Sequence, residues 1–327
     1  MSSDSSLPLA MGFVGLGAMG KPMATNLAKA LPAGAHLYVH DIVAAAVDEL
    51  HALFPTIVVE CGSAREVAQN ADVVLTMLPE GAHVKSVYLN PSTGIMAALN
   101  QTSTKLLIDS STIDTATNLH IRSQLATHSP GTSFYDAPVS GGVLGAERAT
   151  VAFFAGASPS DPTLPRLTCL LQPMGSKTIP CGGASLGLAA KLSNNYLSGL
   201  ITIATSEAMD MGMRAGIRAD VLASVFKAGT AQNTICDVFN PVPGVCAAAP
   251  SSHGYVGGFR VQLMRKDIGL AVALARHVGA RNVLGAAGLG VYAAASEAED
   301  CRDRDSRVVY RYLGGKEHWE GKEVAAE

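Results

Sequence analysis

The stretch MGFVGLGAMGKPM, residues 11 to 23, places glycines directly after an apolar, strand-like run. Gly15, Gly17 and Gly20 have the spacing G-x-G-x-x-G, and a helix-like segment follows them. In such a strand-turn-helix unit the first glycine permits a tight turn, the second lets a pyrophosphate approach the backbone, and the third lets the helix pack on the strand. Glycine triplets also arise by chance in a chain with 33 glycines. The flanking strand and helix favour a dinucleotide-binding loop.

Asp41 ends the next strand-like run, where a carboxylate would hold the adenosine ribose hydroxyls of a dinucleotide. Without the glycines, an ordinary strand-end aspartate would be the better interpretation. Ile42, Val43 and Ala44 follow, so no arginine stands there to receive a 2′-phosphate. The sequence therefore favours NAD over NADP.

Strand-like and helix-like segments alternate through the first half of the chain. The predicted strands span residues 10–15, 36–40, 56–59, 72–77, 105–109 and 151–156. Several are continuous apolar runs, as expected of parallel strands that helices cover on both faces. After residue 180, long segments rich in Ala and Leu replace the strand signals. We predict an α/β protein with a Rossmann-type doubly wound sheet in residues 10–180 and an all-helical domain in residues 181–327, joined by a long helix.

Composition argues against several other classes of protein. A net charge of −3 and a pI near 6.3 give no dense basic face for nucleic acid. Charged residues interrupt the apolar stretches well before a membrane-spanning length. The six cysteines are scattered without a C-x-x-C pair, which favours a reducing compartment and no structural zinc. We expect no nucleic-acid or membrane partner.

Loops after the predicted strands lie where open α/β sheets bind ligands. Residues 77–84 follow the fourth strand and residues 109–117 the fifth. In the second of these loops, Ser111 or Thr112 could cap the next helix, and capping alone would explain those hydroxyls.

The stretch DAPVSGGVLGA, residues 136 to 146, is more informative. Ser140, Gly141 and Gly142 could present a hydroxyl and successive backbone N–H groups to an anion, because glycine tolerates the dihedral angles that such a concave surface needs. A plain turn built on two glycines is the alternative.

The stretch GLAAKLSNNYLSG, residues 187 to 199, contains one lysine among apolar and small residues. If the segment is helical, Lys191 and Asn195 project from one face, one turn apart, beside an apolar stripe that includes Leu188 and Leu192. A surface helix whose lysine faces water is the simplest interpretation of this segment alone.

Seven motifs occur here in the order seen in the β-hydroxyacid dehydrogenases, and the chain resembles that family from about residue 11 to about residue 315. The motifs are GFVGLGAMGKPMATNL, TMLP, IDSSTID, DAPVSGGVLGAE, GLAAKLSNN, NPVPGV and GGFRVQLMRKDIGLA. Within the family, the chain looks most like the 3-hydroxyisobutyrate dehydrogenases. Seven motifs in register are far more specific than one glycine loop.

The resemblance implies roles for individual residues. Lys191 matches the catalytic base, and Asn195 matches a residue that positions the substrate. Lys266 and Asp267 match the family's second lysine and its aspartate partner, close to both cofactor and substrate. The implied substrate-binding residues are Ser140, Gly141, Gly142 and Lys266.

The resemblance also implies a set of cofactor contacts. They are Gly15, Leu16, Gly17, Ala18, Met19, Gly20, Asp41, Leu78, Pro79, Thr112, Lys266 and Asp267. Three positions depart from the family pattern: Ala18 and His83 stand where asparagine is frequent, and Arg265 stands where a small or apolar residue is common. The first two departures could weaken cofactor contacts without abolishing them.

Alcohol oxidation by hydride transfer leaves a proton on the hydroxyl, and the sequence offers no metal-ligand cluster to receive it. A lysine serves as the base only if its pKa falls from about 10.4 to about 7 or 8, which corresponds to about 4 kcal/mol. Burial against Leu188 and Leu192, with positive charge from Lys266, would lower it. We therefore predict that Lys191 lies in a cleft between the two domains.

The resemblance implies NAD-dependent oxidation of 3-hydroxyisobutyrate to methylmalonate semialdehyde, a step of valine catabolism. Reduction of tartronate semialdehyde is an alternative within the family, whereas 6-phosphogluconate dehydrogenase needs a longer chain and a phosphate site not evident here. A non-catalytic dinucleotide-binding module is the alternative from another class. Retention of Lys191, Asn195 and Ser140 argues against it, because such a module needs only the glycine loop and Asp41.

Three further expectations concern one long loop, the oligomeric state and the cellular location. Residues 240–259 are rich in Pro, Gly and Ser and form either a functional cover or a surface excursion. Apolar helix faces in the second half suggest a homodimer or homotetramer. The family implies the mitochondrial matrix in a eukaryote and otherwise the cytoplasm, although residues 1–10 have no Lys or Arg and show no transit peptide.

Overall fold

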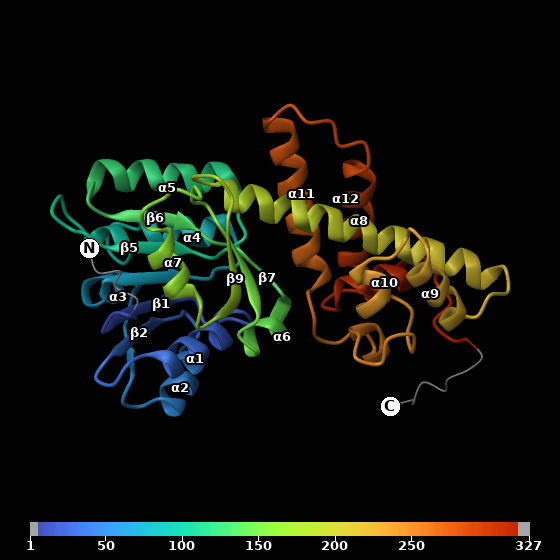
Figure 1. Cartoon of the computed structure of the whole chain (residues 1–327), viewed down its shortest axis with the longest axis horizontal. Coiled ribbons are helices and arrows are strands. Elements are labelled where there is room, and N and C mark those ends of the chain that lie inside the picture. Colours follow the sequence, from blue (N-terminus) through green and yellow to red (C-terminus); the bar gives the residue numbers. More distant parts are fainter. Residues whose placement is uncertain (1–5, 320–327) are drawn as a thin grey trace. The chain divides into compact units, whose positions relative to one another are not determined.

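The computed structural model describes residues 6–319 (Figure 1). Contacts divide the chain into two compact units, the first ending at Lys191 and the second beginning at Leu192. The long helix α8 (Leu186–Arg214) contributes to both units. Its first turn belongs to the first unit because Leu188 is fully buried in that unit's core. The domain boundary predicted from the sequence lies somewhat earlier, at the glycine-rich turn near residue 180.

The first unit is built on a six-stranded parallel sheet with the strand order β3-β2-β1-β4-β5-β6. Its strands are β1 (Ala10–Val14), β2 (His36–His40), β3 (Val58–Glu60), β4 (Val73–Thr76), β5 (Leu106–Asp109) and β6 (Ser133–Asp136). The strand order reverses between β1 and β4, and this point of reversal is where doubly wound sheets bind dinucleotides. The predicted fold class is confirmed.

Alternate residues of the strands point to opposite faces of the sheet, and each face has its own core. Phe13 and Leu75 belong to the core that also contains residues of α1 and α2, whereas Val14 and Val74 belong to the core that contains residues of α3, α4 and α5. Burial on both faces explains why these strands are continuous apolar runs. The helices are α1 (Gly20–Ala30), α2 (Ala44–Leu53), α3 (Ala64–Asn70), α4 (Gly81–Leu89) and α5 (Thr115–His128), with a 3-10 turn η1 (Ile95–Ala98).

A second, three-stranded sheet with the order β7-β8-β9 completes the first unit. It comprises β7 (Val139–Ser140), β8 (Val151–Ala155) and β9 (Gly175–Pro180), with α6 (Gly142–Glu147) and α7 (Leu164–Leu171) between them. The predicted strand at 151–156 is β8 and so lies outside the main sheet. The strands β6, β7 and β9 were not predicted. In β6 only Phe134 and Tyr135 are apolar or aromatic, β7 has two residues, and β9 is largely polar and exposed.

In the described residues of the second unit, helices and turns of helix are joined by irregular segments, and the one β interaction is an isolated bridge between Arg260 and Asp305. After α8 come α9 (Ala219–Ala228), α10 (Thr234–Val238), η2 (Pro250–His253), α11 (Val261–His277), α12 (Gly285–Glu297), η3 (Ser306–Val308) and α13 (Val309–Tyr312). Tyr292 of α12 donates a hydrogen bond of 3.0 Å to the carbonyl of Gly199 on α8. Among the described helices none is long and apolar enough to cross a membrane.

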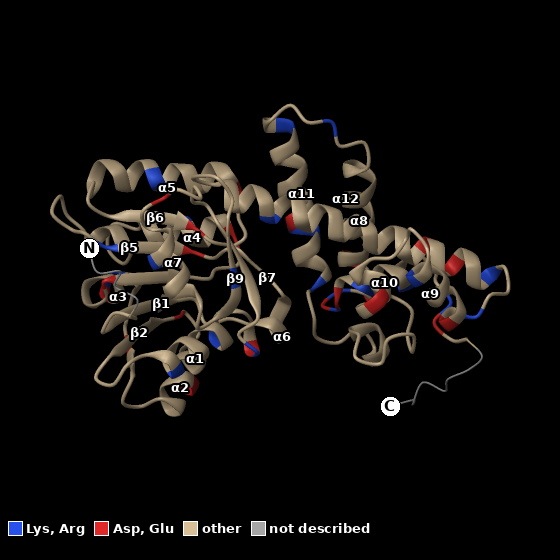
Figure 2. Ribbon diagram, viewed as in Figure 1, with Lys and Arg blue, Asp and Glu red and all other residues tan. Residues whose placement is uncertain are grey.

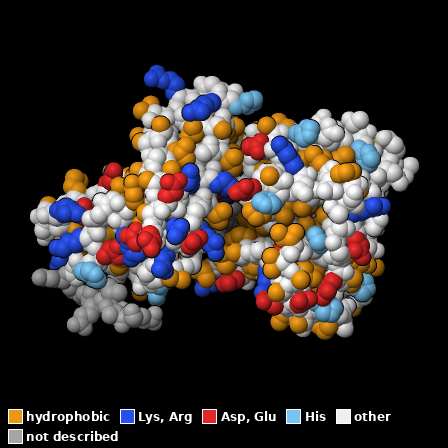
Figure 3. All heavy atoms as spheres, turned by 180° about the vertical axis from the view of Figure 1, so that it is seen from behind, with side chains coloured by type: hydrophobic (Ala, Val, Ile, Leu, Met, Phe, Trp, Pro, Cys, Tyr) orange, Lys and Arg blue, Asp and Glu red, His pale blue; other side chains and the backbone are white. Residues whose placement is uncertain are grey.

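Charged residues are nearly absent from the strands of the main sheet (Figure 2). Glu60, Asp109 and Asp136 are the only Lys, Arg, Asp or Glu residues in its six strands, and each is the last residue of its strand. On the face of the molecule drawn in Figure 3, basic side chains lie among acidic ones. The carboxyl edge of the sheet therefore carries isolated carboxylates in an otherwise apolar layer.

Candidate active site

The glycine loop between β1 and α1 combines two closed positions with one open position. A Cβ atom on Gly15, whose φ is +97°, would lie 2.3 Å from the carbonyl oxygen of Met77, and one on Gly20 would lie 1.9 Å from the carbonyl oxygen of Gly15. A Cβ atom on Gly17 would meet nothing within 4 Å. The fold itself thus requires the outer glycines, whereas the middle glycine borders free space. This arrangement fits the close approach of a pyrophosphate.

Asp41 is tied to this loop by its carboxylate. Oδ2 accepts a hydrogen bond from the backbone N–H of Leu16 (2.5 Å), and Oδ1 accepts one from the N–H of Val43 (2.8 Å). Asp41 therefore joins the turn after β2 to the glycine loop, and it is half-buried rather than enclosed. Its remaining lone pairs can accept further hydrogen bonds, which fits the hydroxyls of a ribose.

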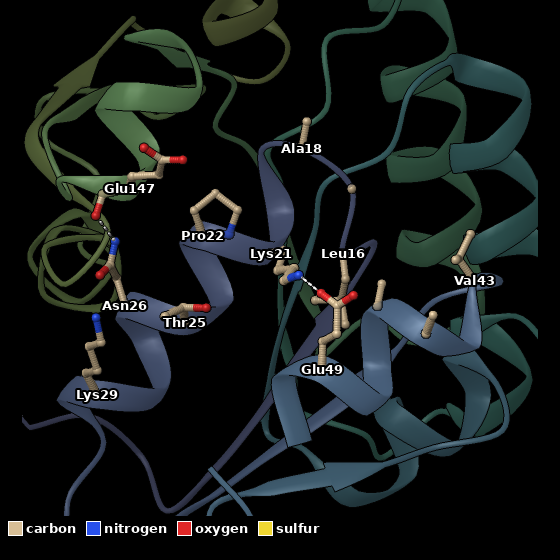
Figure 4. Close-up of a pocket in the computed structure, with 13 residues that line it drawn as sticks. Leu16, Ala18, Lys21, Pro22, Thr25, Asn26, Lys29, Val43, Glu49 and Glu147 are labelled. Carbon is tan, nitrogen blue, oxygen red and sulfur yellow. Dashed lines mark hydrogen bonds and ion pairs between the residues drawn. The ribbon is translucent and has the colours of Figure 1, made fainter. Parts of the chain in front are cut away.

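A cavity of about 680 Å³ lies beside the loop. Lys21 of α1 and Glu49 of α2 point toward each other across it and form an ion pair (Figure 4). This pairing neutralises the basic side chain closest in sequence to the loop. The lining residues are Leu16, Gly17, Ala18, Lys21, Pro22, Thr25, Asn26, Lys29, Val43, Ala45, Ala46, Glu49 and Glu147.

The loops after β4 and β5 are joined through a buried carboxylate. Oδ1 of Asp109 accepts hydrogen bonds from Thr76 Oγ1 (2.7 Å), Ser111 Oγ (2.6 Å) and Ser111 N (3.2 Å). Ser111 Oγ in turn accepts a hydrogen bond of 2.8 Å from the N–H of Leu78. Burial raises the pKa of Asp109 to about 6, although these hydrogen bonds lower it. Oδ2 of the same carboxyl has no hydrogen-bond partner.

This network corrects one prediction. Ser111 and Thr112 do not cap helix α5; the cap is Asp114, whose side chain accepts a hydrogen bond from the N–H of Thr117. Ser111 instead fixes the loop that carries Leu78. This role of Ser111 was not predicted, because the contact spans 33 positions along the chain. The available signal was Asp109, a charged residue at the end of an otherwise apolar strand.

Ser140, Gly141 and Gly142 lie at the junction of β7 and α6. Gly141 has a φ of +140° and Gly142 a φ of +65°, so both use conformations that favour glycine. Both glycines are exposed and Ser140 is half-buried. The stretch is thus a left-handed, accessible turn whose backbone N–H groups can meet an anion.

Lys191 and Asn195 both lie on α8, one turn apart, with exposed fractions of 8% and 6%. In the second unit, Asn195 Nδ2 donates a hydrogen bond of 2.6 Å to Oδ2 of Asp267 on α11. Lys266 Nζ lies 3.2 Å from the other oxygen, Oδ1. Asp267 is 1% exposed and fixes the orientation of the Asn195 amide, since a carboxylate only accepts.

The departures from the family pattern lie in different settings. Ala18 is exposed at the cavity, His83 is exposed on α4, and Arg265 pairs with Glu297 at 3.0 Å. Residues 240–259 form an ordered segment in which Tyr255 is fully buried and donates a hydrogen bond of 2.9 Å to the carbonyl of Pro241. Among residues 6–319, His, Cys, Asp and Glu side chains form no group that could hold a metal ion.

Family comparisons cover nearly the whole described chain. Residues 10–183 match the NAD binding domain of 6-phosphogluconate dehydrogenase. Residues 185–313 match the family described as NAD-binding of NADP-dependent 3-hydroxyisobutyrate dehydrogenase. The first match places the glycine loop and Asp41 in a dinucleotide-binding domain.

Individual dehydrogenases are similar to this chain over most of its length. A probable mitochondrial 3-hydroxyisobutyrate dehydrogenase of Dictyostelium discoideum is 38% identical over 313 residues, which cover 96% of this chain and 92% of the relative. An NAD-dependent L-serine dehydrogenase of Pseudomonas aeruginosa is 38% identical over 282 residues, covering 86% and 90%. The solved structure of Mycobacterium tuberculosis 3-hydroxyisobutyrate dehydrogenase with L-serine is similar with a TM-score of 0.82 and 36% identity, covering 93% of this chain and 98% of that one.

The glycine loop yields a matched pair of substitutions. Gly17→Ala adds a methyl group to free space, so we expect the thermal unfolding temperature to stay near that of the unmodified protein while NAD binding weakens at least about tenfold. Gly20→Ala forces a methyl group against a carbonyl oxygen and should lower stability by about 1–3 kcal/mol or more. Thermal unfolding and calorimetric titration with NAD measure both effects. Unchanged NAD affinity in Gly17→Ala would contradict the assigned binding surface.

The raised pKa of Asp109 leads us to expect an unusual dependence of stability on pH. Its pKa is raised to about 6, so the stability that the protonated carboxyl contributes is complete below about 3.8 and is lost as pH rises through about 6. Asp109→Asn keeps the accepting oxygen and removes the charge. The added amide N–H groups find no partner at the buried Oδ2 position, so the variant carries a constant cost at every pH. Relative to the unmodified protein, we expect its free energy of unfolding to be about 1–3 kcal/mol higher at pH 8 than at pH 4, because only Asp109 bears the cost of ionising.

Urea unfolding followed by circular dichroism across this pH range measures the effect of Asp109→Asn. The exposed Asp48 of α2 provides the control, because Asp48→Asn changes the same chemical group in water. Equal pH profiles for the two variants would contradict the assigned role of burial.

Proposed function

Because the chain belongs to the 3-hydroxyisobutyrate dehydrogenase family of oxidoreductases, we propose that it oxidises 3-hydroxyisobutyrate to methylmalonate semialdehyde with NAD. This is a step of valine breakdown. The observation that carries the proposal is the burial of Lys191, which is only 8% exposed and lies one helical turn before Asn195.

The proposed chemistry assigns one task to each group of residues. Bound NAD would supply the hydride acceptor. Ser140, Gly141 and Gly142 bind the substrate carboxylate through the hydroxyl and the exposed backbone N–H groups. Lys191 Nζ accepts the hydroxyl proton during oxidation and returns it in the reverse direction. Asn195, whose amide Asp267 orients, positions the substrate.

Two features support NAD rather than NADP. Asp41 would place a negative charge beside the 2′ position of the ribose, and a phosphate there would meet repulsion. Lys21, the basic residue at the glycine loop, is already paired with Glu49. Leu78, Pro79, Thr112, Lys266 and Asp267 are further proposed cofactor contacts.

L-Serine is a second candidate substrate. A relative of 38% identity is named an NAD-dependent L-serine dehydrogenase. Serine has the carboxylate and the 3-hydroxyl of 3-hydroxyisobutyrate and differs at carbon 2, so the same residues could process it. Tartronate semialdehyde, in the reductive direction, is a third.

Steady-state turnover of these compounds with NAD and with NADP tests the proposal. The highest kcat/KM should be for 3-hydroxyisobutyrate with NAD. Higher kcat/KM for serine would transfer the assignment to serine. Absence of turnover with all of them, together with intact NAD binding, would favour a non-catalytic dinucleotide-binding module.

Assembly and location are also proposals. Exposed apolar side chains on α8 and α9, among them Leu197, Met211, Val221 and Val225, support a homodimer or homotetramer. Light scattering after size-exclusion chromatography measures the mass. The Dictyostelium relative is named mitochondrial, which supports the mitochondrial matrix if the host is a eukaryote. In any other host we propose the cytoplasm.

Lys191→Ala should lower kcat by at least about 100-fold while the affinity for NAD stays close to that of the unmodified enzyme, because removal of a general base acts on the transition state. Single-turnover kinetics and NAD titration separate the two quantities. Lys177→Ala, at an exposed position on β9, is the matched control and should retain full activity. A parallel loss of NAD binding in Lys191→Ala would mean that the lysine serves the cofactor rather than the proton.

Asp41→Asn removes the charge that disfavours a 2′-phosphate. We expect the ratio of kcat/KM with NADP to kcat/KM with NAD to rise about tenfold, equivalent to about 1.4 kcal/mol. Thermal unfolding controls for the lost hydrogen bond to Leu16 or Val43. A preference of the unmodified enzyme for NADP would refute the role given to Asp41.

A further inference from the structure

We propose that Asp136 is a positioning residue for the reaction: its carboxylate fixes the first turn of α8, and thereby Lys191, relative to the loop of Ser140, Gly141 and Gly142. The inference rests on the proposed role of Lys191 as the base. It adds a residue that touches neither substrate nor cofactor in that proposal.

Both oxygens of the Asp136 carboxylate bind the start of α8. Oδ1 accepts a hydrogen bond of 2.8 Å from the N–H of Ser185, and Oδ2 accepts one of 2.9 Å from the N–H of Leu188. Asp136 is 1% exposed, so water does not compete for these oxygens. Ser185, whose N–H makes the first of these bonds, has a φ of +66°, which is uncommon for a residue with a side chain.

The packing around the carboxylate admits no additional side-chain atoms. A Cβ atom on Gly156 would lie 1.9 Å from Asp136 Oδ1. A Cβ atom on Gly187 would lie 2.1 Å from the carbonyl oxygen of Phe154 and 2.8 Å from Asp136 Oδ2. Glycine at both positions therefore lets α8 approach β8 and the end of β6 as closely as it does. The contact has little room to shift.

Asp136 is close in sequence to one part of the proposed site and bonded to the other. It ends β6, and Ser140 follows four residues later on β7. Leu188, whose N–H it binds, lies one helical turn before Lys191. Because a helix is stiff over one turn, displacement of the Leu188 N–H displaces the amine. The carboxylate thus sets the separation between the proposed base and the proposed carboxylate-binding loop.

An ordinary helix cap would predict something different. Loss of a cap costs about 1 kcal/mol of stability and leaves the chemistry of the folded enzyme unchanged. A positioning residue changes the rate through the group that it positions, since a displacement of about 1 Å can lower a rate about 100-fold. The two accounts therefore differ in whether the effect depends on Lys191.

The test is a double-mutant cycle of Asp136→Asn and Lys191→Ala. Asp136→Asn keeps one accepting oxygen and turns an N–H donor toward an N–H of α8. We expect its kcat to fall roughly 10- to 100-fold with NAD affinity unchanged. In the Lys191→Ala background the same substitution should have no further effect on kcat, because the positioned group is already gone. An equal fall in both backgrounds would overturn the proposal.

The control is Ser63→Ala, which removes the side-chain cap of α3, a hydrogen bond of 3.2 Å from Glu66 N to Ser63 Oγ. It should lower stability and leave the kcat of the folded enzyme unchanged. If Asp136→Asn does not fold, Gly156→Ala carries the same cycle, because its methyl group would overlap Asp136 Oδ1 and force the carboxylate out of its present position. The same non-additivity with Lys191→Ala is expected, and simple additivity would overturn the proposal here too.

Amide hydrogen exchange supplies a readout that needs no turnover. The N–H groups of Ser185 and Leu188 should exchange at least about tenfold faster in Asp136→Asn, while the first turn of α11, which has no side-chain cap, should be unaffected. Unchanged exchange would overturn the anchoring contact.

The outcomes also separate this inference from the proposed function. If the unmodified enzyme oxidises none of the tested acids but hydrogen exchange responds to Asp136→Asn, the proposed function fails and the anchoring contact stands. If the enzyme is active and the cycle is additive, only the positioning role fails.

Discussion

Two buried carboxylates at the carboxyl edge of the sheet hold the loops that make up the candidate site in the first unit. Asp109 and Asp136 are paired in register on the neighbouring strands β5 and β6, and both are almost completely buried. Such groups are stable only when N–H and O–H donors compensate for lost water. Asp109 obtains its donors from Thr76 and Ser111, and Asp136 obtains its donors from the start of α8. The hydrogen bonds that these carboxylates need therefore fix the loops after β4 and β5 and the start of α8.

Features of the fold that depend on local sequence could be predicted. The glycine loop and Asp41 lie within one strand-helix-strand unit, so spacing alone indicated their association, and the structure joins them through the hydrogen bond from Leu16. The apolar strands were recognisable because both faces are covered. β6 was not, since only Phe134 and Tyr135 of SFYD form an apolar run, and the partners of its final aspartate lie 49 and 52 positions away. Short strands and long-range caps leave little trace in a single sequence.

In the candidate site, too, features set by local sequence could be predicted and those set by long-range contacts could not. Lys191 and Asn195 were selected from helical spacing and from the family resemblance, and both prove to be buried. The contact of Asn195 with Asp267 spans 72 positions and could not be derived from spacing. Capping by Ser111, one of the possibilities that the sequence left open, is not what the structure shows, because a hydroxyl at a loop has several possible partners. The buried Asp109 was the stronger competitor for it.

The orientation of Asn195 limits which substrate groups it can contact. Nδ2 donates to Asp267, and Oδ1 accepts a hydrogen bond of 3.1 Å from Asn194 Nδ2. One N–H and one lone pair of the amide remain, so it can serve a hydroxyl, which both donates and accepts. The carboxylate and hydroxyl that the proposal assigns to the glycine turn, Lys191 and Asn195 are common to 3-hydroxyisobutyrate and serine. Selection between a methyl group and an ammonium group at carbon 2 must therefore arise from other side chains, and the ratio of the two activities measures how polar those side chains are.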